Sequence, residues 1–224
     1  MGSSGTNLCR RFVGVLVLFM SGSVASSIGR GQVPPFAGQS QSPTVKAEQT
    51  AVLAGGCFWG VDAVFKHVKG VTSVVSGYSG GSVANPDYET VSTGTTGHAE
   101  SVKITYDPSQ VRYSDLLRIF FSVATDPTEL NRQGPDEGTQ YRSVIFYASE
   151  AQKQTALAYI DQLNKAKVFS RPIVTQVVPL KAFYPAEGYH QDFLARHPTY
   201  PYIVFNDLPK VRALQKQFPN FYKK

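Results

Sequence analysis

From Thr50 onward, apolar positions recur with the spacing of alternating strands and helices. Short apolar or alternating runs predict strands, and apolar residues three to four positions apart predict helices with one buried face. The predicted strands span 50–54, 71–77, 99–106, 141–148 and 173–180, and the predicted helices span 58–68, 115–123, 149–168, 186–196 and 209–218. Strands interleaved with helices in this way predict an α/β (α+β) two-layer sandwich with a mixed sheet.

Turn and capping residues mark the boundaries of these elements. Ser114 is expected to cap the helix 115–123, and Ser149 with Gln152 has the spacing of a capping box at the start of the helix 149–168. The stretch 78–90, which contains glycines and an Asn-Pro pair, predicts a loop that carries Tyr88.

The strand 99–106 places a carboxylate among apolar side chains. Because successive side chains of a strand point to opposite faces, Glu100 shares a face with Val102, Ile104 and Tyr106. A carboxylate on a buried face must be paired or protonated, and loss of water raises its pKa. A glutamate at a strand end that reaches out to solvent fits the same pattern.

The N-terminal part of the chain differs in composition from the predicted domain. Arg10 and Arg11 precede an apolar run, 12–20, followed by small residues, which matches a secretory signal peptide. We therefore expect residues 1–25 to be removed on export, which makes the protein secreted or periplasmic. The run is too short for a stable membrane anchor, and residues 26–48, rich in Ser, Gln, Gly and Pro, predict a flexible linker.

The charge of the chain is unremarkable once the predicted signal peptide is set aside. The full sequence has 22 Lys+Arg and 16 Asp+Glu, a net charge of +6, and residues 1–25 contain two arginines and no acid, which leaves 20 against 16, or +4. The basic residues are scattered and form no cluster with aromatic residues, so nucleic-acid binding is excluded. The protein is expected to be a monomer.

The cysteines narrow the function more than the composition does. The chain has two, and Cys9 lies in the predicted signal peptide, so the mature protein keeps Cys57 alone. Cys57 lies in the turn Gly55-Gly56-Cys57-Phe58-Trp59-Gly60, between a predicted strand and a predicted helix. A thiol at a helix N-terminus is expected to have a lowered pKa and to be reactive. A buried structural cysteine is the alternative; a metal site is not expected, because the ligand spacing is missing.

These residues together favour a particular reaction. A nucleophilic thiolate, a glutamate on an apolar face and tyrosines on neighbouring loops can supply a nucleophile, a proton donor and hydroxyl hydrogen bonds. Attack of a thiolate on a sulfoxide sulfur needs all three, because the departing oxygen must be protonated. The products are a cysteine sulfenic acid and a thioether.

Three motifs of the chain resemble those of the A-type peptide methionine sulfoxide reductases. They are the turn Gly55–Gly60, the sequence Gly97-His98-Ala99-Glu100, and Asn131-Arg132-Gln133-Gly134 with Asp136 and the stretch Gly138-Thr139-Gln140-Tyr141-Arg142-Ser143. The resemblance covers about 50–198. It implies a catalytic domain over 49–198 with a ferredoxin-like core, and as substrate the S epimer of methionine sulfoxide, free or in oxidised proteins.

The resemblance also implies roles for individual residues. Cys57 corresponds to the nucleophile and Glu100 to the proton donor. Tyr88 and Tyr141 correspond to the hydroxyls that bind the sulfoxide oxygen. Phe58 and Trp59 correspond to the pocket for the substrate methyl group. Asp136 matches an acidic residue near the site, and His190 matches a histidine in the C-terminal part of the family sequence.

The chain departs from that family at two places. Residues 199–224 form a predicted C-terminal tail without the resolving cysteine that many members carry, and Phe193 stands where many members have tyrosine. The sulfenic acid on Cys57 is therefore expected to be reduced by an external thiol of the thioredoxin, glutaredoxin or glutathione type. No bound cofactor is expected.

Two other functions fit parts of the sequence. Cys57 with His98 or His190 and an acid could form a thiol acyl-transferase or hydrolase, which requires a histidine within hydrogen-bonding reach of the sulfur. An aromatic-rich binding module with a structural Cys57 would instead have a thiol that resists alkylation at neutral pH.

Overall fold

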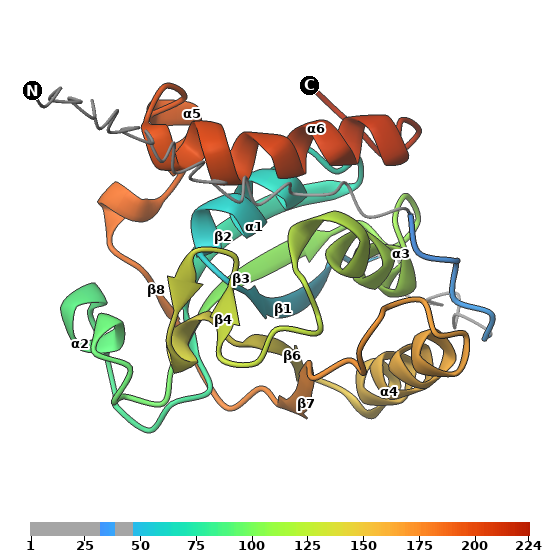
Figure 1. Cartoon of the computed structure of the whole chain (residues 1–224), viewed down its shortest axis with the longest axis horizontal. Helices are drawn as coiled ribbons and strands as arrows, with labels where there is room; N and C mark the ends of the chain where they lie inside the picture. The colour runs from blue at the N-terminus through green and yellow to red at the C-terminus, as the bar shows by residue number, and fades with distance from the viewer. Residues whose placement is uncertain (1–31, 39–46) are drawn as a thin grey trace, which may run out of the picture.

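A six-stranded mixed sheet runs through the computed structural model, which describes residues 32–38 and 47–224 (Figure 1). Its strand order is β7-β6-β1-β3-β2-β8; β6 and β7 are parallel and the other neighbours antiparallel. The strands are β1 (Gln49–Gly55), β2 (Val71–Ser79), β3 (Ala99–Tyr106), β6 (Ser143–Tyr147), β7 (Gln176–Pro179) and β8 (Phe183–Pro185).

The central four strands have the ferredoxin-like arrangement. In chain order the core runs β1, α1 (Phe58–Lys66), β2, β3, α3 (Tyr113–Ile119) and β6, and in space β3 lies between β1 and β2. This confirms the predicted two-layer sandwich with a mixed sheet. Edge strands β7 and β8 extend the core on its two sides.

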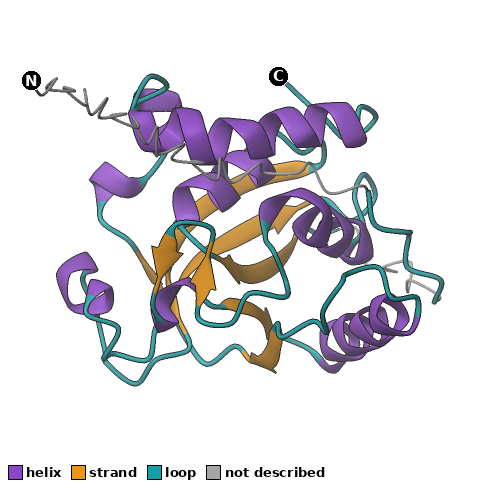
Figure 2. Cartoon of the chain, in the orientation of Figure 1, coloured by secondary structure: helices purple, strands orange, loops and turns teal. Residues whose placement is uncertain are grey.

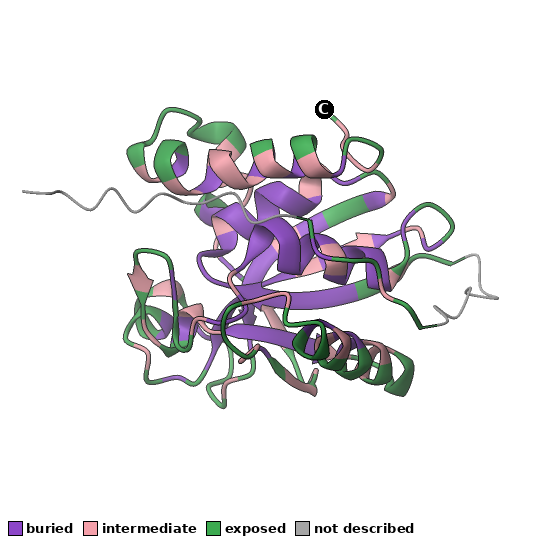
Figure 3. Cartoon of the chain, turned by 45° about the vertical axis from the view of Figure 1, so that its right-hand side comes forward, coloured by how far each residue is buried: buried purple, intermediate pink, exposed green. Residues whose placement is uncertain are grey.

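One face of the sheet packs against helices. Leu53 and Ile104 of the sheet share an apolar core with Val64 of α1, Leu117 of α3 and Leu163 of α4 (Glu150–Lys165). Figures 1 and 2 show α6 (Leu208–Gln217) lying along α1, on the outside of the helical layer. In Figure 3 the middle of the sheet is largely buried, whereas the outer faces of the peripheral helices are exposed.

Most predicted elements are present, with shifted ends. The strand 99–106 is found as predicted, and Ser149 caps α4 by accepting a hydrogen bond from the Gln152 N–H at 3.2 Å. The capping prediction for Ser114 is wrong: α3 begins at Tyr113, because the Asp115 carboxylate accepts a hydrogen bond from the Arg112 N–H at 3.2 Å. Beyond Ile119 this helix continues as a π-helical turn, Phe120–Ala124.

Two loops contain regular structure, the predicted loop 78–90 and the loop between α3 and β6. β2 continues to Ser79, so Tyr78 lies in the sheet directly opposite Glu100. The short helix α2 (Tyr88–Ser92) follows, because the Asp87 carboxylate accepts a hydrogen bond from the Thr90 N–H at 2.8 Å. The second loop contains the two-residue strands β4 (Arg132–Gln133) and β5 (Asp136–Glu137).

The predicted helix 186–196 is wrong as a single element. Its place is taken by a 3₁₀ turn, Gly188–His190, and the short helix α5 (Phe193–Arg196). Asp192 between them has a left-handed φ of 57°, which interrupts a helix. The break turns His190 toward the core, where it is 2% exposed.

The C-terminal residues form part of the same folded unit. Ile203, Leu214 and Phe218 are buried, and Leu214 and Phe218 belong to the main core. A π-helical turn, Ile203–Asp207, leads directly into α6. The predicted boundary after residue 198 therefore coincides with no break in packing.

Part of the segment assigned to a linker also contacts the domain. Val33 is buried, and its N–H donates a hydrogen bond to the Ser122 hydroxyl at 3.1 Å. The ring of Phe36 packs edge-on against Tyr159 of α4. Residues 1–25, the predicted signal peptide, and Cys9 with them, lie outside the described residues. Within the described ranges, no helix combines the length and hydropathy needed to cross a membrane.

Candidate active site

Cys57 is the N-cap residue of α1, in the turn that follows β1. The turn needs glycine at position 56, because its φ is +95° and an added Cβ would lie 2.5 Å from the Gln133 side chain. The sequence therefore fixes a sharp bend that brings the sulfur to the end of the sheet. This agrees with the predicted strand-to-helix turn.

The thiol of Cys57 is not poised as a thiolate, contrary to the prediction. Cys57 is only 7% exposed, and burial raises its pKa well above the usual value, with further contributions from Glu100 and Asp207. The Trp59 N–H and Lys210 act in the opposite direction but do not reverse the shift. Desolvation and carboxylates from distant segments therefore outweigh the helix N-terminus.

Glu100 occupies the environment that the strand pattern predicts. It is 3% exposed, and its Oε2 accepts a hydrogen bond from the Phe58 N–H at 2.9 Å. Burial raises the pKa of Glu100 to about 8; the Phe58 N–H lowers it, and Asp136 and Asp207 raise it further. Glu100 is therefore protonated at neutral pH. Its hydrogen-bond donor, Phe58, directly follows Cys57 in the chain.

A cavity of about 150 Å³ opens onto these two groups. Its lining contains seven of the eight predicted site residues, together with one residue that was not predicted, Tyr202. The lining residues are Cys57, Phe58, Trp59, Tyr88, Glu100, Asp136, Tyr141 and Tyr202. Segments far apart in the sequence thus meet at one small site.

A larger hollow, of about 470 Å³, lies elsewhere along the outer edge of β2. It is lined by Lys66, 71–75, 185–186, Gln191, Asp192 and Lys223, and includes none of the predicted site residues. Neither a thiol nor an aromatic side chain faces it. The chemistry suggested by the sequence therefore belongs to the smaller cavity.

His190 lies behind the aromatic wall of the cavity instead of lining it. Its Nδ1 accepts a hydrogen bond from the Trp59 indole N–H at 3.1 Å, and its ring is 5.0 Å from that of Phe58. Burial lowers the pKa of His190, although Glu187 acts against this, so the ring is neutral. The structure makes His190 a residue that positions Trp59, not one that contacts a ligand in the cavity.

The indole of Trp59 is held on both sides. Its ring stacks on Phe193 with centroids 3.7 Å apart and planes 5° from parallel. Tyr200 and Tyr202 meet the indole edge-on, with centroids 6.4 and 5.9 Å away. The apolar wall is therefore held by its neighbours. Phe193, which stands where the family resemblance implies a tyrosine in many members, supplies the stacking surface.

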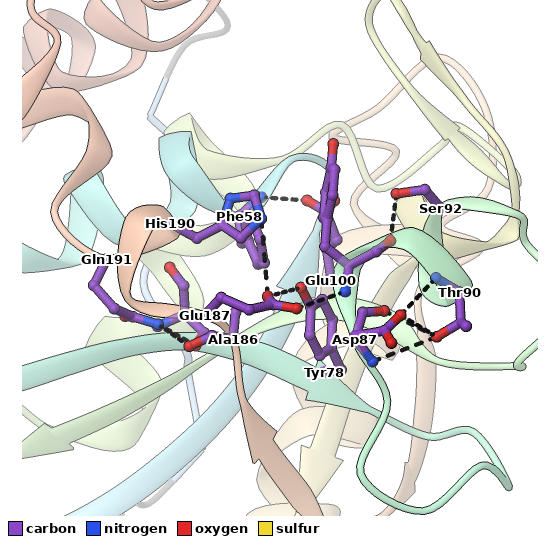
Figure 4. Close-up of polar contacts among 12 residues, drawn as sticks. Phe58, Tyr78, Asp87, Thr90, Ser92, Glu100, Ala186, Glu187, His190 and Gln191 are labelled. Atoms are coloured by element: carbon purple, nitrogen blue, oxygen red, sulfur yellow. Dashed lines mark hydrogen bonds and ion pairs between the residues drawn. The ribbon is translucent and has the colours of Figure 1, made fainter.

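Glu187 fixes the tyrosine side of the site (Figure 4). One carboxylate oxygen accepts a hydrogen bond from the Tyr88 N–H at 2.8 Å, and the other accepts one from the Tyr78 hydroxyl at 2.9 Å. Beside it, Gln191 bonds to the backbone of Ser76 and Ala186. These contacts place Tyr88 of α2 over the sheet end that carries Glu100.

The tyrosines that line the cavity carry its hydroxyl groups. The Tyr202 hydroxyl donates a short hydrogen bond to the Asp136 carboxylate. Burial raises the pKa of Tyr88 and Tyr141, and the nearby Glu100 adds to both shifts. Both side chains are therefore neutral hydroxyls that can donate hydrogen bonds.

An ion pair from the C-terminal segment lies against the first turn of α1. Asp207 is fully buried, and its Oδ1 is 3.4 Å from the Lys210 Nζ. A Cβ on Gly60 would lie 2.1 Å from the Asp207 Oδ1 and 2.8 Å from the Lys210 Nζ. Glycine at position 60 is thus required by long-range packing, which the turn motif alone could not show.

Sequence reasoning missed Tyr202, Asp207 and Lys210 for a common reason. All three lie in 199–224, which has no recognisable motif and was treated as a tail. The available signal was the periodic helix 209–218, whose buried face needed a partner. Within the described residues, no three His, Cys, Asp or Glu side chains are grouped so as to hold a metal ion.

The similarity to known proteins extends over the whole folded unit. Residues 49–222 match the family model described as peptide methionine sulfoxide reductase. The chain is 64% identical over 174 residues to peptide methionine sulfoxide reductase MsrA 2 of Mesorhizobium japonicum, covering 78% of this chain and 89% of that protein. It is 50% identical over 176 residues to MsrA of Thermus thermophilus, covering 79% and 98%.

Solved structures with the same fold are also similar in sequence. Methionine sulfoxide reductase A of Corynebacterium diphtheriae is 32% identical with a TM-score of 0.61, covering 76% of this chain and 88% of that one. The reduced form of Mxr1 from Saccharomyces cerevisiae is 31% identical with a TM-score of 0.61, covering 72% and 94%. The six-stranded sheet and its helical layer are therefore shared with these proteins.

Proposed function

Because the chain belongs to the peptide methionine sulfoxide reductase family, it reduces methionine sulfoxide, and we propose that Cys57 and Glu100 carry out the reaction. The observation that carries this assignment is the position of a buried, protonated carboxyl group beside the cysteine in one small cavity. The proposed substrate is the S epimer, free or within a polypeptide.

The binding step uses the aromatic wall and the hydroxyl groups. Phe58 and Trp59 hold the substrate methyl group, since both rings line the cavity and are fixed by their neighbours. The hydroxyls of Tyr88 and Tyr141 donate hydrogen bonds to the sulfoxide oxygen. Asp136 acts through Tyr202. It accepts a hydrogen bond from the Tyr202 hydroxyl and so fixes the orientation of that ring in the cavity wall.

The chemical step transfers the sulfoxide oxygen to the enzyme. The Cys57 sulfur attacks the sulfoxide sulfur while the carboxyl proton of Glu100 passes to the oxygen. The bond between the two sulfur atoms then breaks as the oxygen passes from the substrate sulfur to the cysteine sulfur, which gives a sulfenic acid on Cys57 and free methionine. Two electrons move from the cysteine to the substrate sulfur, and the proton lost by the thiol replaces the one given by Glu100.

The pKa values define what substrate binding must change. In the free protein the thiol is protonated, because burial and two carboxyl groups disfavour the thiolate. The Phe58 N–H holds one oxygen of Glu100, which leaves the other to carry the transferable proton.

The sulfenic acid is recycled by an external thiol. Residues 26–224 contain no cysteine besides Cys57, so after removal of residues 1–25 no partner thiol exists in the chain. A first thiol displaces water and forms a mixed disulfide with Cys57, and a second releases the free cysteine and a disulfide. A thioredoxin, a glutaredoxin or glutathione has the required chemistry.

The acyl-transferase alternative has no histidine in the cavity. His98 accepts a hydrogen bond from the Gly81 N–H at 3.1 Å and contacts the Val83 carbonyl oxygen at 2.8 Å. His190 accepts its hydrogen bond from Trp59. Neither imidazole lines the space in front of Cys57, so neither is a general base for its thiol.

Export and a monomeric state complete the proposal. The charged and apolar N-terminal pattern supports cleavage after about Ala25 and release to the periplasm or medium. N-terminal sequencing of the secreted protein and light scattering test these two points.

Each epimer of a methionine sulfoxide peptide, incubated with dithiothreitol, tests the reaction itself. Wild type should reduce the S epimer and leave the R epimer, and Cys57→Ser should reduce neither. Equal reduction by the wild type and Cys57→Ser would contradict the assignment of the nucleophile. Reduction of both epimers by the wild type would contradict the proposed stereochemistry alone.

A further inference from the structure

The cavity is large enough for a methionine sulfoxide side chain but not for its main chain. A volume of about 150 Å³ is that of a cavity that accepts one benzene molecule. Two methylene groups, the sulfoxide and the methyl group are of this size. The main chain of a polypeptide substrate must therefore lie outside the cavity, across its rim.

Tyr189 lies exposed near the tyrosine side of the cavity. Its side chain is 58% exposed, and its ring centroid is 4.2 Å from that of His190. His190 is in turn 4.4 Å from the ring of Tyr88, which lines the cavity. An exposed ring is thus coupled to the tyrosine wall.

Tyr200 lies exposed on the part of the rim next to the indole. It is 49% exposed, and its ring meets Trp59 and Phe193 edge-on at 6.4 and 5.7 Å. Two residues later, Tyr202 lines the cavity itself. Both exposed rings are therefore linked by ring contacts to residues that line the cavity, Tyr200 directly to Trp59 and Tyr189 through His190 to Tyr88.

We propose that Tyr189 and Tyr200 form a docking surface for the residues that flank methionine sulfoxide in a polypeptide, and that this surface selects apolar flanking residues. The proposal rests on the proposed function, because a methionine sulfoxide side chain bound in the cavity determines where the rest of the polypeptide lies. Exposed aromatic rings offer a large apolar area at low entropic cost.

Two peptides and one small compound test the docking surface. One peptide has leucines on both sides of methionine-S-sulfoxide and the other has glycines; the small compound is N-acetyl methionine-S-sulfoxide amide. In the wild type, kcat/KM for the leucine peptide should exceed that for the glycine peptide by about tenfold, as burial of apolar area predicts. Equal values for the two peptides would overturn the proposal.

Variants then assign the selectivity to the two rings. In Tyr189→Ser and in Tyr200→Ser, the ratio of kcat/KM for the leucine peptide to that for the small compound should fall by about tenfold. A ratio measured within one preparation does not depend on the fraction folded. Leu157→Ala is the matched control, because Leu157 is 48% exposed on α4, which supplies no cavity residue; its ratio should equal that of the wild type.

The outcomes separate this proposal from the proposed function. Reduction of the small compound with unchanged ratios in both tyrosine variants would overturn the docking surface and leave the reaction assigned. A lowered ratio in Leu157→Ala as well would show a nonspecific effect and overturn the assignment to the rim. Failure to reduce any of the three compounds would overturn both.

Discussion

The turn Gly55–Gly60 and the C-terminal segment 199–217 contribute to the same site in different ways. The turn is specified locally, because a strand, two glycines and a helix start fix the position of Cys57. The C-terminal segment has no motif, yet it supplies Tyr202, Asp207 and Lys210 by packing along α1. The identity of the nucleophile is therefore local information, whereas its electrostatic environment is long-range.

The thiol pKa shows what this difference means for function. Local reasoning from the helix N-terminus predicts a lowered value, but burial and the carboxyl groups of Glu100 and Asp207 raise it. A reactive-cysteine motif thus predicts which atom reacts and not its protonation state in the free protein. Substitutions in the two regions separate the two contributions.

Replacement of the proton donor should have the largest effect. Glu100→Gln should lower kcat/KM at pH 7 by about 10²–10⁴-fold, the usual contribution of general acid catalysis. Glu150→Gln is the control, since that side chain is 63% exposed on α4, and its kcat/KM should equal that of the wild type.

The pH dependence of the same pair tests the assigned role. Burial raises the pKa of Glu100 to about 8, so the acid form is complete well below this pH and is lost as the pH rises through it. The ratio of wild-type kcat/KM to that of Glu100→Gln should therefore fall between pH 7 and 9. A constant ratio over this range would remove Glu100 from the acid role.

Contact between the two regions is tested at Gly60. In Gly60→Ala the new Cβ would lie 2.1 Å from the Oδ1 of Asp207, which is buried and cannot move into solvent. The free energy of unfolding should fall by about 1–3 kcal/mol, as for other overpacked sites. Gly188→Ala is the control, because nothing lies within 4 Å of its added Cβ. Equal denaturation midpoints for the two variants would contradict the close packing of α6 on α1.

The charges of the C-terminal segment should shift the thiol titration by a smaller amount. Lys210 lowers and Asp207 raises the pKa of Cys57, so the two substitutions should act in opposite directions. Iodoacetamide alkylation of Cys57 at neutral pH should become slower in Lys210→Met, because the thiolate loses a nearby positive charge. It should become faster in Asp207→Asn, which keeps the hydrogen-bonding oxygen.

A conservative variant distinguishes charge from packing at the same position. Lys210→Arg keeps the positive charge, and its alkylation rate should stay within about twofold of the wild type. Shifts of the same sign in Lys210→Met and Asp207→Asn would mean that the pair acts only through packing.

The sequence predicts the elements around the motifs better than those that join them. The alternation in β3 correctly places Glu100 on the helix-facing side, and the glycine turn correctly places Cys57. His190 was placed in the substrate site, but a left-handed Asp192 breaks the predicted helix and leaves the imidazole behind Trp59. Tyr202 reaches the cavity only because α6 packs on α1, which no local pattern encodes.

The most direct test of the account is a single turnover without any reducing thiol. Reduced protein, with residues 1–25 removed, is mixed with excess methionine-S-sulfoxide, and both methionine and the mass of the peptide containing Cys57 are measured. The account predicts about one methionine per chain and one added oxygen on Cys57 that reacts as a sulfenic acid. Continued methionine formation without reductant, or an unmodified Cys57 after one turnover, would contradict it.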